Sequence, residues 1–233
     1  MKHYKIYIIN MRKNEDRKQY IIDQMNKWNI TNYEFIEGID GNNLDDYILN
    51  ELVSIDQMST NLNRQAVKSE MGCALSHKKV YKKIIEEDSP ALILEDDVFI
   101  SVDFKKLVDI KFNNDFDIIF PNNRYVEENV NDWQNLLVGN SNQVINDITF
   151  YRIAILGYTF KELWHGAYAY IISPKAAKKI IQINTPVQFE SDNWSRFNLQ
   201  NIWVSNTMTI KHSREFITSM VDRYNSLVEA NQI

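Results

Sequence analysis

The chain is poor in the residues that build cross-linked, many-turned or membrane-spanning proteins. It has 233 residues, of which one is cysteine, six are glycine and four are proline. The single cysteine, Cys73, excludes an internal disulfide framework and a zinc site built from several cysteines. The scarcity of glycine and proline argues against a collagen-like, linker-rich or many-turned all-β chain. No apolar run approaches the ~20 residues of a membrane helix and no secretory signal is visible, so no transmembrane segment is predicted.

Positive charge is also in short supply. Lysine and arginine total 26 against 31 acidic residues, and the net charge of -5 provides no general basic field for nucleic acid or an anionic membrane. Hydrophobic residues make up 44% and charged residues 24%, so the chain can bury a sizeable core. These values predict one cytoplasmic domain over residues 1–233, with peripheral attachment to a membrane left open. The abundance of isoleucine and asparagine, which A/T-rich codons produce, suggests a bacterium or a large DNA virus as source.

Short apolar runs alternate with segments of helical periodicity along the chain. Strands are predicted at residues 5–11, 33–36, 91–94, 117–120, 168–173, 202–204 and 208–210. Helices are predicted at residues 14–28, at 69–87, from Pro174 onward and at 214–229. Residues 42–65 are polar and only weakly periodic, so no element is predicted there. The alternation predicts an α/β fold with a mostly parallel sheet flanked by helices on both faces.

Three consecutive acids follow the apolar run ALIL at residues 91–94. Ligands of open α/β sheets bind beyond the carboxyl ends of the strands, where Glu95, Asp96 and Asp97 are expected. Their oxygens suit a hard cation such as Mg²⁺ or Mn²⁺, and in an extended chain the first and third would face the same side. An exposed acidic turn without metal is the alternative. Asp115 and Asp117 precede their strand, so they are predicted to lie at the opposite edge of the sheet.

The order of the motifs resembles glycosyltransferase family 25, the lipopolysaccharide- and collagen-modifying sugar transferases. The segments that carry the resemblance are IYIINMRKNEDR, FIEGIDG, SEMGCALSHKKVYKKII, ALILEDDV and AYAYIISPKAAKKI. The resemblance runs from about Ile6 to His212. It implies a GT-A-like, Rossmann-type fold, a UDP-galactose or UDP-glucose donor, a Mn²⁺ or Mg²⁺ ion and inversion at the anomeric carbon.

The resemblance also assigns roles to individual residues. The nucleotide-binding candidates are Asn10, Arg12, Arg17, Asp40, Gly41, Ser76, His77 and Asp96. A helix N-terminus with two guanidinium groups is in addition a physical candidate for a diphosphate site. The alternatives are a solvated helix face for the arginines, a plain tight turn for the Asp-Gly pair and a satisfied helix histidine for His77.

The metal ligands that the resemblance implies are Asp97 and Glu95, with His212 as a late histidine that completes the set. Capping of a final helix is the alternative for His212. The family carries an aspartate after a Pro-Val pair, whereas here Gln188 follows Pro186 and Val187. The base that takes the acceptor proton is therefore assigned to Asp192, with Glu190 as the second candidate.

The predicted function is transfer of a hexose from UDP to a hydroxyl of a glycan, a lipopolysaccharide or a glycosylated protein. The expected partners are a nucleotide sugar and a glycan acceptor, and the sequence predicts no oligomeric state. Two alternatives stay open. One is an inactive nucleotide-sugar or glycan-binding module of the same fold, and the other is a glycoside hydrolase that uses a pair of carboxylates.

Overall fold

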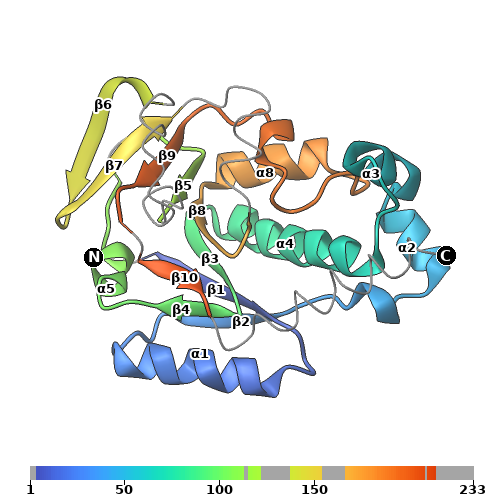
Figure 1. Cartoon of the computed structure of the whole chain (residues 1–233), viewed down its shortest axis with the longest axis horizontal. Helices are drawn as coiled ribbons and strands as arrows, with labels where there is room; N and C mark the ends of the chain where they lie inside the picture. The colour runs from blue at the N-terminus through green and yellow to red at the C-terminus, as the bar shows by residue number, and fades with distance from the viewer. Residues whose placement is uncertain (1–3, 113–114, 122–136, 154–165, 208, 214–233) are drawn as a thin grey trace.

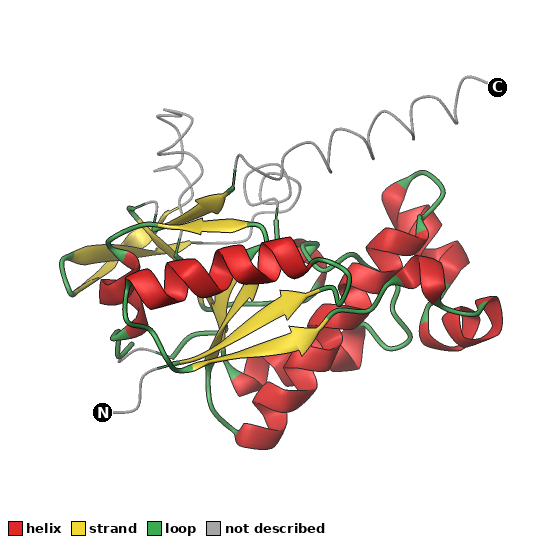
Figure 2. Cartoon of the chain, turned by 90° about the horizontal axis from the view of Figure 1, so that it is seen from below, coloured by secondary structure: helices red, strands yellow, loops and turns green. Residues whose placement is uncertain are grey.

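An eight-stranded sheet with helices on both faces forms the centre of the molecule (Figure 1). The computed structural model describes residues 4–112, 115–121, 137–153, 166–207 and 209–213. The strand order is β2-β1-β3-β8-β5-β9-β7-β6, and β10 with β4 forms a separate two-stranded sheet. Helix α1 covers one face, while α4 and α8 cover the other, as the view from below shows (Figure 2). The predicted α/β fold is confirmed.

The first half of the sheet is parallel, as the sequence predicts. Its strands are β1 (Lys5–Asn10), β2 (Tyr33–Glu37) and β3 (Ala91–Glu95). The segments that connect them include the helices α1 (Glu15–Lys27) and α4 (Lys68–Glu87). Strand β1 lies between β2 and β3 and runs parallel to both. Tyr7 and Ile9 pack on the α4 side, whereas Ile6 and Ile8 pack on the α1 side. Burial on both faces explains why this strand reads as a continuous apolar run.

The second half of the sheet is mixed, although the sequence pattern predicts mostly parallel pairing. It contains β5 (Ile118–Phe120), β6 (Leu137–Ile145), β7 (Ile148–Ile153), β8 (Ala169–Ile172) and β9 (Ile202–Ser205). Strand β8 is antiparallel to β3 and β5, and the β6-β7 hairpin adds antiparallel pairs beside β9. Among the strands that the structure describes in this half, β5 and β9 form the one parallel pair. A short buried apolar run has the same composition in either direction, so it carries no information about strand orientation.

A small helical unit sits on the N-terminal end of α4. It contains η1 (Gly41–Asn43), α2 (Asp46–Leu52) and α3 (Ile55–Leu62), in the region where the sequence predicts no element. Leu49, Met58 and Val187 form part of its own hydrophobic cluster. Close backbone contact joins this unit to α4, because a Cβ on Gly72 would lie 2.5 Å from the Ile39 carbonyl oxygen.

The remaining elements pack against the two faces of the sheet. They are β4 (Val98–Ile100), α5 (Phe104–Val108), α8 (Pro174–Ile183), η3 (Trp194–Arg196) and β10 (Ile210–His212). Helix α8 begins with proline, as its sequence predicts, and the Ser173 side chain caps its N-terminus. The helix predicted at residues 214–229 lies outside the described residues. Within the described chain, no helix is long and apolar enough to span a membrane.

Candidate functional site

Polar side chains from β1, α1 and the turn after β3 meet at the carboxyl ends of the parallel strands. The Asn10 amide Nδ2 donates to Asp96 Oδ2 at 2.8 Å and to the Asn14 carbonyl at 3.1 Å. The Arg17 guanidinium Nη1 lies 3.1 Å from Asp96 Oδ1 and 3.3 Å from Asp97 Oδ2. All these side chains are mostly buried. Asn10, Arg17, Asp96 and Asp97, which the sequence assigns to nucleotide or metal binding, therefore lie together at this edge.

The chain does not stay extended through the three acids, and this corrects the expected pairing of Glu95 with Asp97. Strand β3 ends at Glu95, and residues 96 and 97 form a turn before β4. The turn brings Asp96 and Asp97 to the same guanidinium group. Glu95 instead accepts from His77 and Cys73 on α4. Alternation of side chains holds only within a strand, so the prediction fails where the strand ends.

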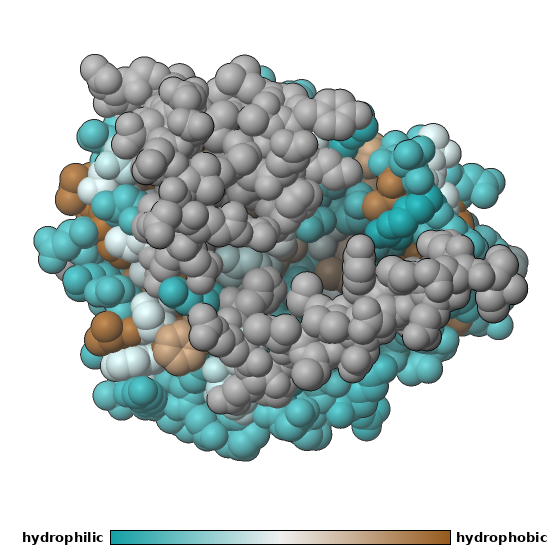
Figure 3. All heavy atoms as spheres, in the orientation of Figure 1, coloured by the Kyte–Doolittle hydropathy of each residue, from teal (hydrophilic) through white to brown (hydrophobic). Residues whose placement is uncertain are grey.

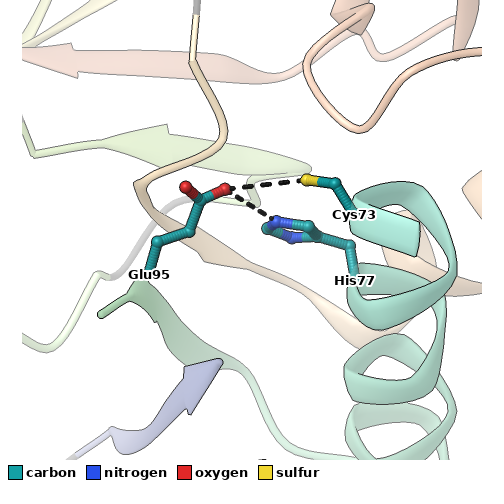
Figure 4. Close-up of side chains that lie close together, drawn as sticks. All are labelled: Cys73, His77 and Glu95. Carbon is teal, nitrogen blue, oxygen red and sulfur yellow. Dashed lines mark hydrogen bonds and ion pairs between the residues drawn. The ribbon is translucent and has the colours of Figure 1, made fainter. Parts of the chain in front are cut away.

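Glu95, His77 and Cys73 form a second cluster between β3 and α4 (Figure 4). His77 Nε2 lies 3.2 Å from Glu95 Oε1, and Cys73 Sγ lies 3.9 Å from the same oxygen. His77 Nδ1 is 2.6 Å from the Tyr170 hydroxyl, which is 2.7 Å from the Tyr81 hydroxyl. Burial raises the pKa of both tyrosines, so they stay protonated over the physiological range.

Asp40 and Gly41 lie in the turn that leads from β2 into η1. The Asp40 carboxylate accepts from the Asn42 backbone N–H and pairs with Lys13 at 2.5 Å. The hydrogen bond from Lys13 is the main reason why the pKa of Asp40 lies below its usual range. Gly41 is buried, and a Cβ there would lie 1.8 Å from the Lys68 carbonyl oxygen. Its small size is therefore required for packing against α4.

The Ser76 side chain binds the backbone of the turn after β2 and not a nucleotide-sugar donor, which corrects its expected role. The Ser76 hydroxyl donates to the Gly72 carbonyl and accepts from the Ile39 backbone N–H, each at 2.7 Å. Its side chain is 2% exposed. Both bonds stay within the protein, so Ser76 serves to join α4 to the β2 turn.

The two arginines of the predicted diphosphate site are in different environments. Arg12 is exposed in the turn after β1, whereas Arg17 faces the two aspartates. Figure 3 shows that the outer side of α1 is hydrophilic. The predicted set of two guanidinium groups around one diphosphate is not assembled here, because Arg17 is engaged with the carboxylates.

His212 lies in β10, and its side chain is outside the described residues. Its backbone pairs with Val98 in the antiparallel β4-β10 ladder. The following Ser213 N–H donates to the Asp97 carbonyl at 2.7 Å. The backbone register therefore brings His212 beside the acidic turn, at the place where the sequence expects a late ligand.

Both candidates for the base lie in the segment that passes over α4. Asp192 Oδ2 accepts from the Gly166 backbone N–H at 3.2 Å. Glu190 Oε2 accepts from the Asn193 amide at 2.9 Å. Ser191 between them lies 3.3 Å from Cys73 Sγ. Asp192 thus adjoins the residue that contacts the second cluster, whereas Glu190 bonds within its own segment.

The competing acids Asp115 and Asp117 lie at the other edge of the sheet. Asp117 is 2% exposed and accepts from the Gln200 backbone N–H at 2.7 Å. Asp115 accepts from the Asn201 amide at 2.9 Å. Both stand before β5, beside the point where β8 ends and β9 begins. The sheet-edge argument correctly separates them from the acids that follow β3.

Sequence reasoning assigned no site role to Lys13, Tyr81, Tyr170 or Cys73. The spacing of Cys73 and His77 is a usable signal, since residues four apart share one helix face. Tyr170 and Tyr81 come from elements distant in sequence, and Lys13 is an ordinary charged turn residue. Nothing in the local sequence marks these three.

Comparison with known proteins assigns the chain to a family. The model of glycosyltransferase family 25 (LPS biosynthesis protein) matches residues 3–195. The chain is 36% identical over 110 residues to the "Putative glycosyltransferase R655" of Acanthamoeba polyphaga mimivirus, a match that covers 46% of this chain and 32% of that protein.

More distant relatives match over a longer part of this chain. Identity to procollagen galactosyltransferase 2 of Homo sapiens is 22% over 184 residues, which covers 77% of this chain and 27% of that protein. Procollagen galactosyltransferase 1-A of Xenopus laevis is 22% identical over 186 residues, with 76% and 28% covered. The chain thus spans 32% or less of the length of these relatives. Because the family model matches most of its length, the chain belongs to glycosyltransferase family 25.

Proposed function

We propose that this chain transfers a hexose, galactose or glucose, from a UDP-sugar to a hydroxyl of a glycan, a lipopolysaccharide or a glycosylated protein. The observation that carries the proposal is the junction of Asn10, Arg17, Asp96 and Asp97 at the carboxyl ends of β1 and β3. The names of two relatives, both procollagen galactosyltransferases, favour galactose as the hexose and a glycosylated protein as one acceptor.

The residues around Asp97 fit a hard divalent cation. Two carboxylates share one guanidinium group, so the three formal charges sum to -1. Asn10 and Arg17 each bind one oxygen of Asp96, which holds that carboxylate in place. Asp97 is thus the better ligand for Mn²⁺ or Mg²⁺, which prefer oxygen donors, and the backbone of His212 lies nearby. When bound, the ion would neutralise charge on the departing diphosphate.

The other side chains of this edge have supporting roles in the proposal. Arg17 and Asn10 orient Asp96 beside the nucleotide. Asp40, held by Lys13, presents its turn at the same end of the sheet, where a uridine ribose would contact it. The exposed Arg12 supplies a positive charge for the diphosphate.

Asp192 is proposed as the base. An inverting transfer needs a carboxylate that takes the proton of the acceptor hydroxyl while its oxygen attacks the anomeric carbon. The hydrogen bond from the Gly166 N–H holds the Asp192 carboxylate in the segment beside Cys73, where the proposal places the acceptor hydroxyl. Inversion, the ion and the base all belong to the proposal.

The test separates the proposal from its two rivals. The protein is incubated with UDP-galactose or UDP-glucose and Mn²⁺, with and without a panel of galactosides, lipopolysaccharide oligosaccharides and collagen glycopeptides. We expect UDP release that depends on an acceptor, together with a product one hexose heavier. Sugar release at the same rate without any acceptor would support a hydrolase instead. Thermal stabilisation by UDP-sugars without transfer to any acceptor would support a binding module.

A further inference from the structure

We propose that Cys73, His77 and Glu95 form a site for a borderline-soft divalent ion, Zn²⁺, separate from the ion assigned to Asp97. The three side chains come from one face of α4 and from the end of β3 (Figure 4). Their ligand atoms, one sulfur, one nitrogen and one oxygen, lie within 4.8 Å of one another. This proposal goes beyond the transferase function and does not depend on it.

The distances within the cluster match the edges of a tetrahedral zinc site. With Zn–N and Zn–O bonds of about 2.0–2.2 Å, a tetrahedral angle separates nitrogen and oxygen by about 3.4 Å, and with Zn–S of about 2.3 Å it separates sulfur and oxygen by about 3.6 Å. The measured separations from Glu95 Oε1 are 3.2 Å to His77 Nε2 and 3.9 Å to Cys73 Sγ. Both measured separations thus lie within a few tenths of an ångström of the tetrahedral values, and all three ligand atoms lie within 4.8 Å of one another.

The surroundings of His77 resemble the outer shell of a metal-binding histidine. Ligand histidines usually bond their second ring nitrogen to a polar partner, which orients the ring toward the ion. Here His77 Nδ1 bonds the Tyr170 hydroxyl at 2.6 Å, and that hydroxyl bonds Tyr81 at 2.7 Å. His77 is 1% exposed and its ring stacks on Tyr170. The chain of hydroxyls therefore holds Nε2 toward Glu95 and Cys73.

The chemistry of the ligands distinguishes this site from the acidic turn. A thiolate and an imidazole select Zn²⁺ over Mg²⁺ or Mn²⁺, which prefer the all-oxygen surroundings of Asp97. Three protein ligands leave a fourth position for water or another oxygen, and the Ser191 hydroxyl lies nearby, 3.3 Å from Cys73 Sγ. Filling the site would clamp α4 to the end of β3, directly before Asp96.

The test uses Co²⁺ as a spectroscopic substitute for Zn²⁺ in the full-length, metal-stripped, reduced protein. We expect a thiolate-to-cobalt charge-transfer band and the intense visible bands of tetrahedral cobalt, both lost on addition of Zn²⁺ and unchanged by millimolar Mg²⁺. Zn²⁺ should also slow alkylation of Cys73 in the unmodified protein, and this measurement needs no variant.

Two variants and a control identify the ligands. Cys73→Ser should remove the charge-transfer band and weaken Zn²⁺ binding at least about 100-fold, since loss of even an outer partner costs about 10- to 100-fold. Glu95→Gln should weaken binding while keeping the band. Glu86→Gln removes an exposed acid from the same helix and should change neither. Circular dichroism shows whether each variant is folded.

Three results would overturn the proposal. One is a cobalt complex without the thiolate band, and another is Zn²⁺ affinity that Cys73→Ser leaves unchanged. The third is alkylation of Cys73 at the same rate with and without Zn²⁺. Each would show that the cluster is a hydrogen-bonded group in which the thiol and the imidazole simply donate to Glu95.

Discussion

Two pairs of aspartates stand at opposite edges of the same sheet and are held in different ways. Asp96 and Asp97, after β3, are bound by the side chains of Asn10 and Arg17. Before β5, Asp117 accepts from the backbone N–H groups of Gln200 at 2.7 Å and of Asn201 at 3.4 Å. Asp96 and Asp97 are thus bound by side chains that can rotate, whereas Asp117 is bound by backbone N–H groups and its neighbour Asp115 by the Asn201 side chain.

This difference separates a carboxylate that is available to a ligand from one that maintains the fold. A bond to a backbone N–H ties two segments together, and removing its acceptor leaves buried donors unsatisfied. A bond to an arginine or asparagine side chain can rearrange when an ion or a diphosphate arrives. We therefore propose a functional role for Asp97 and a role in stability for Asp117.

Asp192 tests whether a carboxylate bound by a backbone N–H can also be catalytic, because the Gly166 N–H binds it and it is the proposed base. Asp192→Asn should keep UDP-sugar binding and lose about 10²- to 10⁴-fold in transfer rate, the usual contribution of general acid-base catalysis. The measurements are binding by calorimetry and the rate with an active acceptor. Glu190→Gln is the matched control and should transfer within a few-fold of the parent rate.

An exchange of these two outcomes would make Glu190 the base. If both variants transferred at the parent rate, the base would lie outside residues 190–192. A loss of binding and rate together, with a lower midpoint of unfolding, would place Asp192 with Asp117 as a carboxylate that maintains the fold.

The next largest effect is expected at Asp97. Asp97→Asn keeps the size of the side chain but removes the charge that a hard cation needs, so Mn²⁺-dependent UDP binding should disappear. Transfer should fall about 10²- to 10³-fold, as for other electrostatic groups that stabilise the transition state. The matched control is Asp115→Asn with Asp117→Asn, which should leave turnover within a few-fold. Equal losses in the two proteins would show that the comparison chooses the wrong pair.

The sequence predicts the first half of the molecule better than the second for a physical reason. Strands β1 and β3 are buried on both faces, so their runs are fully apolar and end abruptly at Asn10 and Glu95. The long connections between them, which contain helices, permit the parallel pairing that is observed. Strand β8 has the same apolar character and yet runs antiparallel to its neighbours, because direction depends on the path of the chain between strands.

The candidate site shows the same limit. The position of the acids after β3 follows from the sequence, since it depends on one local boundary. Their partners do not, because the turn at residues 96–97 changes which carboxylate meets Arg17, and the Tyr170 that binds His77 is 93 residues away. The sequence predicts a functional role for Ser76 because its buried hydrogen bonds to Gly72 and Ile39 cannot be recognised from the sequence alone.

Substitutions of Asp117 and Asp115 should change the stability of the fold, and this effect is smaller than the expected losses in transfer rate. Asp117→Ala should lower the free energy of unfolding by about 1–3 kcal/mol, because it removes the buried carboxylate that accepts from the Gln200 N–H. Asp115→Ala, at a side chain that is 67% exposed, should change it by less than about 0.5 kcal/mol. Urea unfolding at neutral pH measures both. Equal losses would mean that the two acids of this pair act together through Lys175.

Asp40 combines both kinds of bond, and its effect should be the smallest. Its carboxylate accepts from the Asn42 N–H and pairs with Lys13, whose side chain is 64% exposed. The lowered pKa of Asp40 means that the folded state favours the ionised carboxylate. The stabilisation is therefore complete above the unfolded pKa of about 4 and is lost as the pH falls through the lower folded value.

Lys13→Met should therefore destabilise the protein at pH 7 and have little effect once Asp40 is protonated, so the difference from the parent protein should shrink as the pH falls below about 4. Solvent screening limits the loss at pH 7 to about 1 kcal/mol or less. Urea unfolding midpoints at both pH values measure it. Arg12→Met removes the same charge from the neighbouring exposed residue and should show a smaller loss with no such pH dependence. If the two variants behaved alike, net charge and not the Lys13–Asp40 pair would explain the loss, and Asp40 would depend on its bonds to the Asn42 N–H and the Asn43 amide.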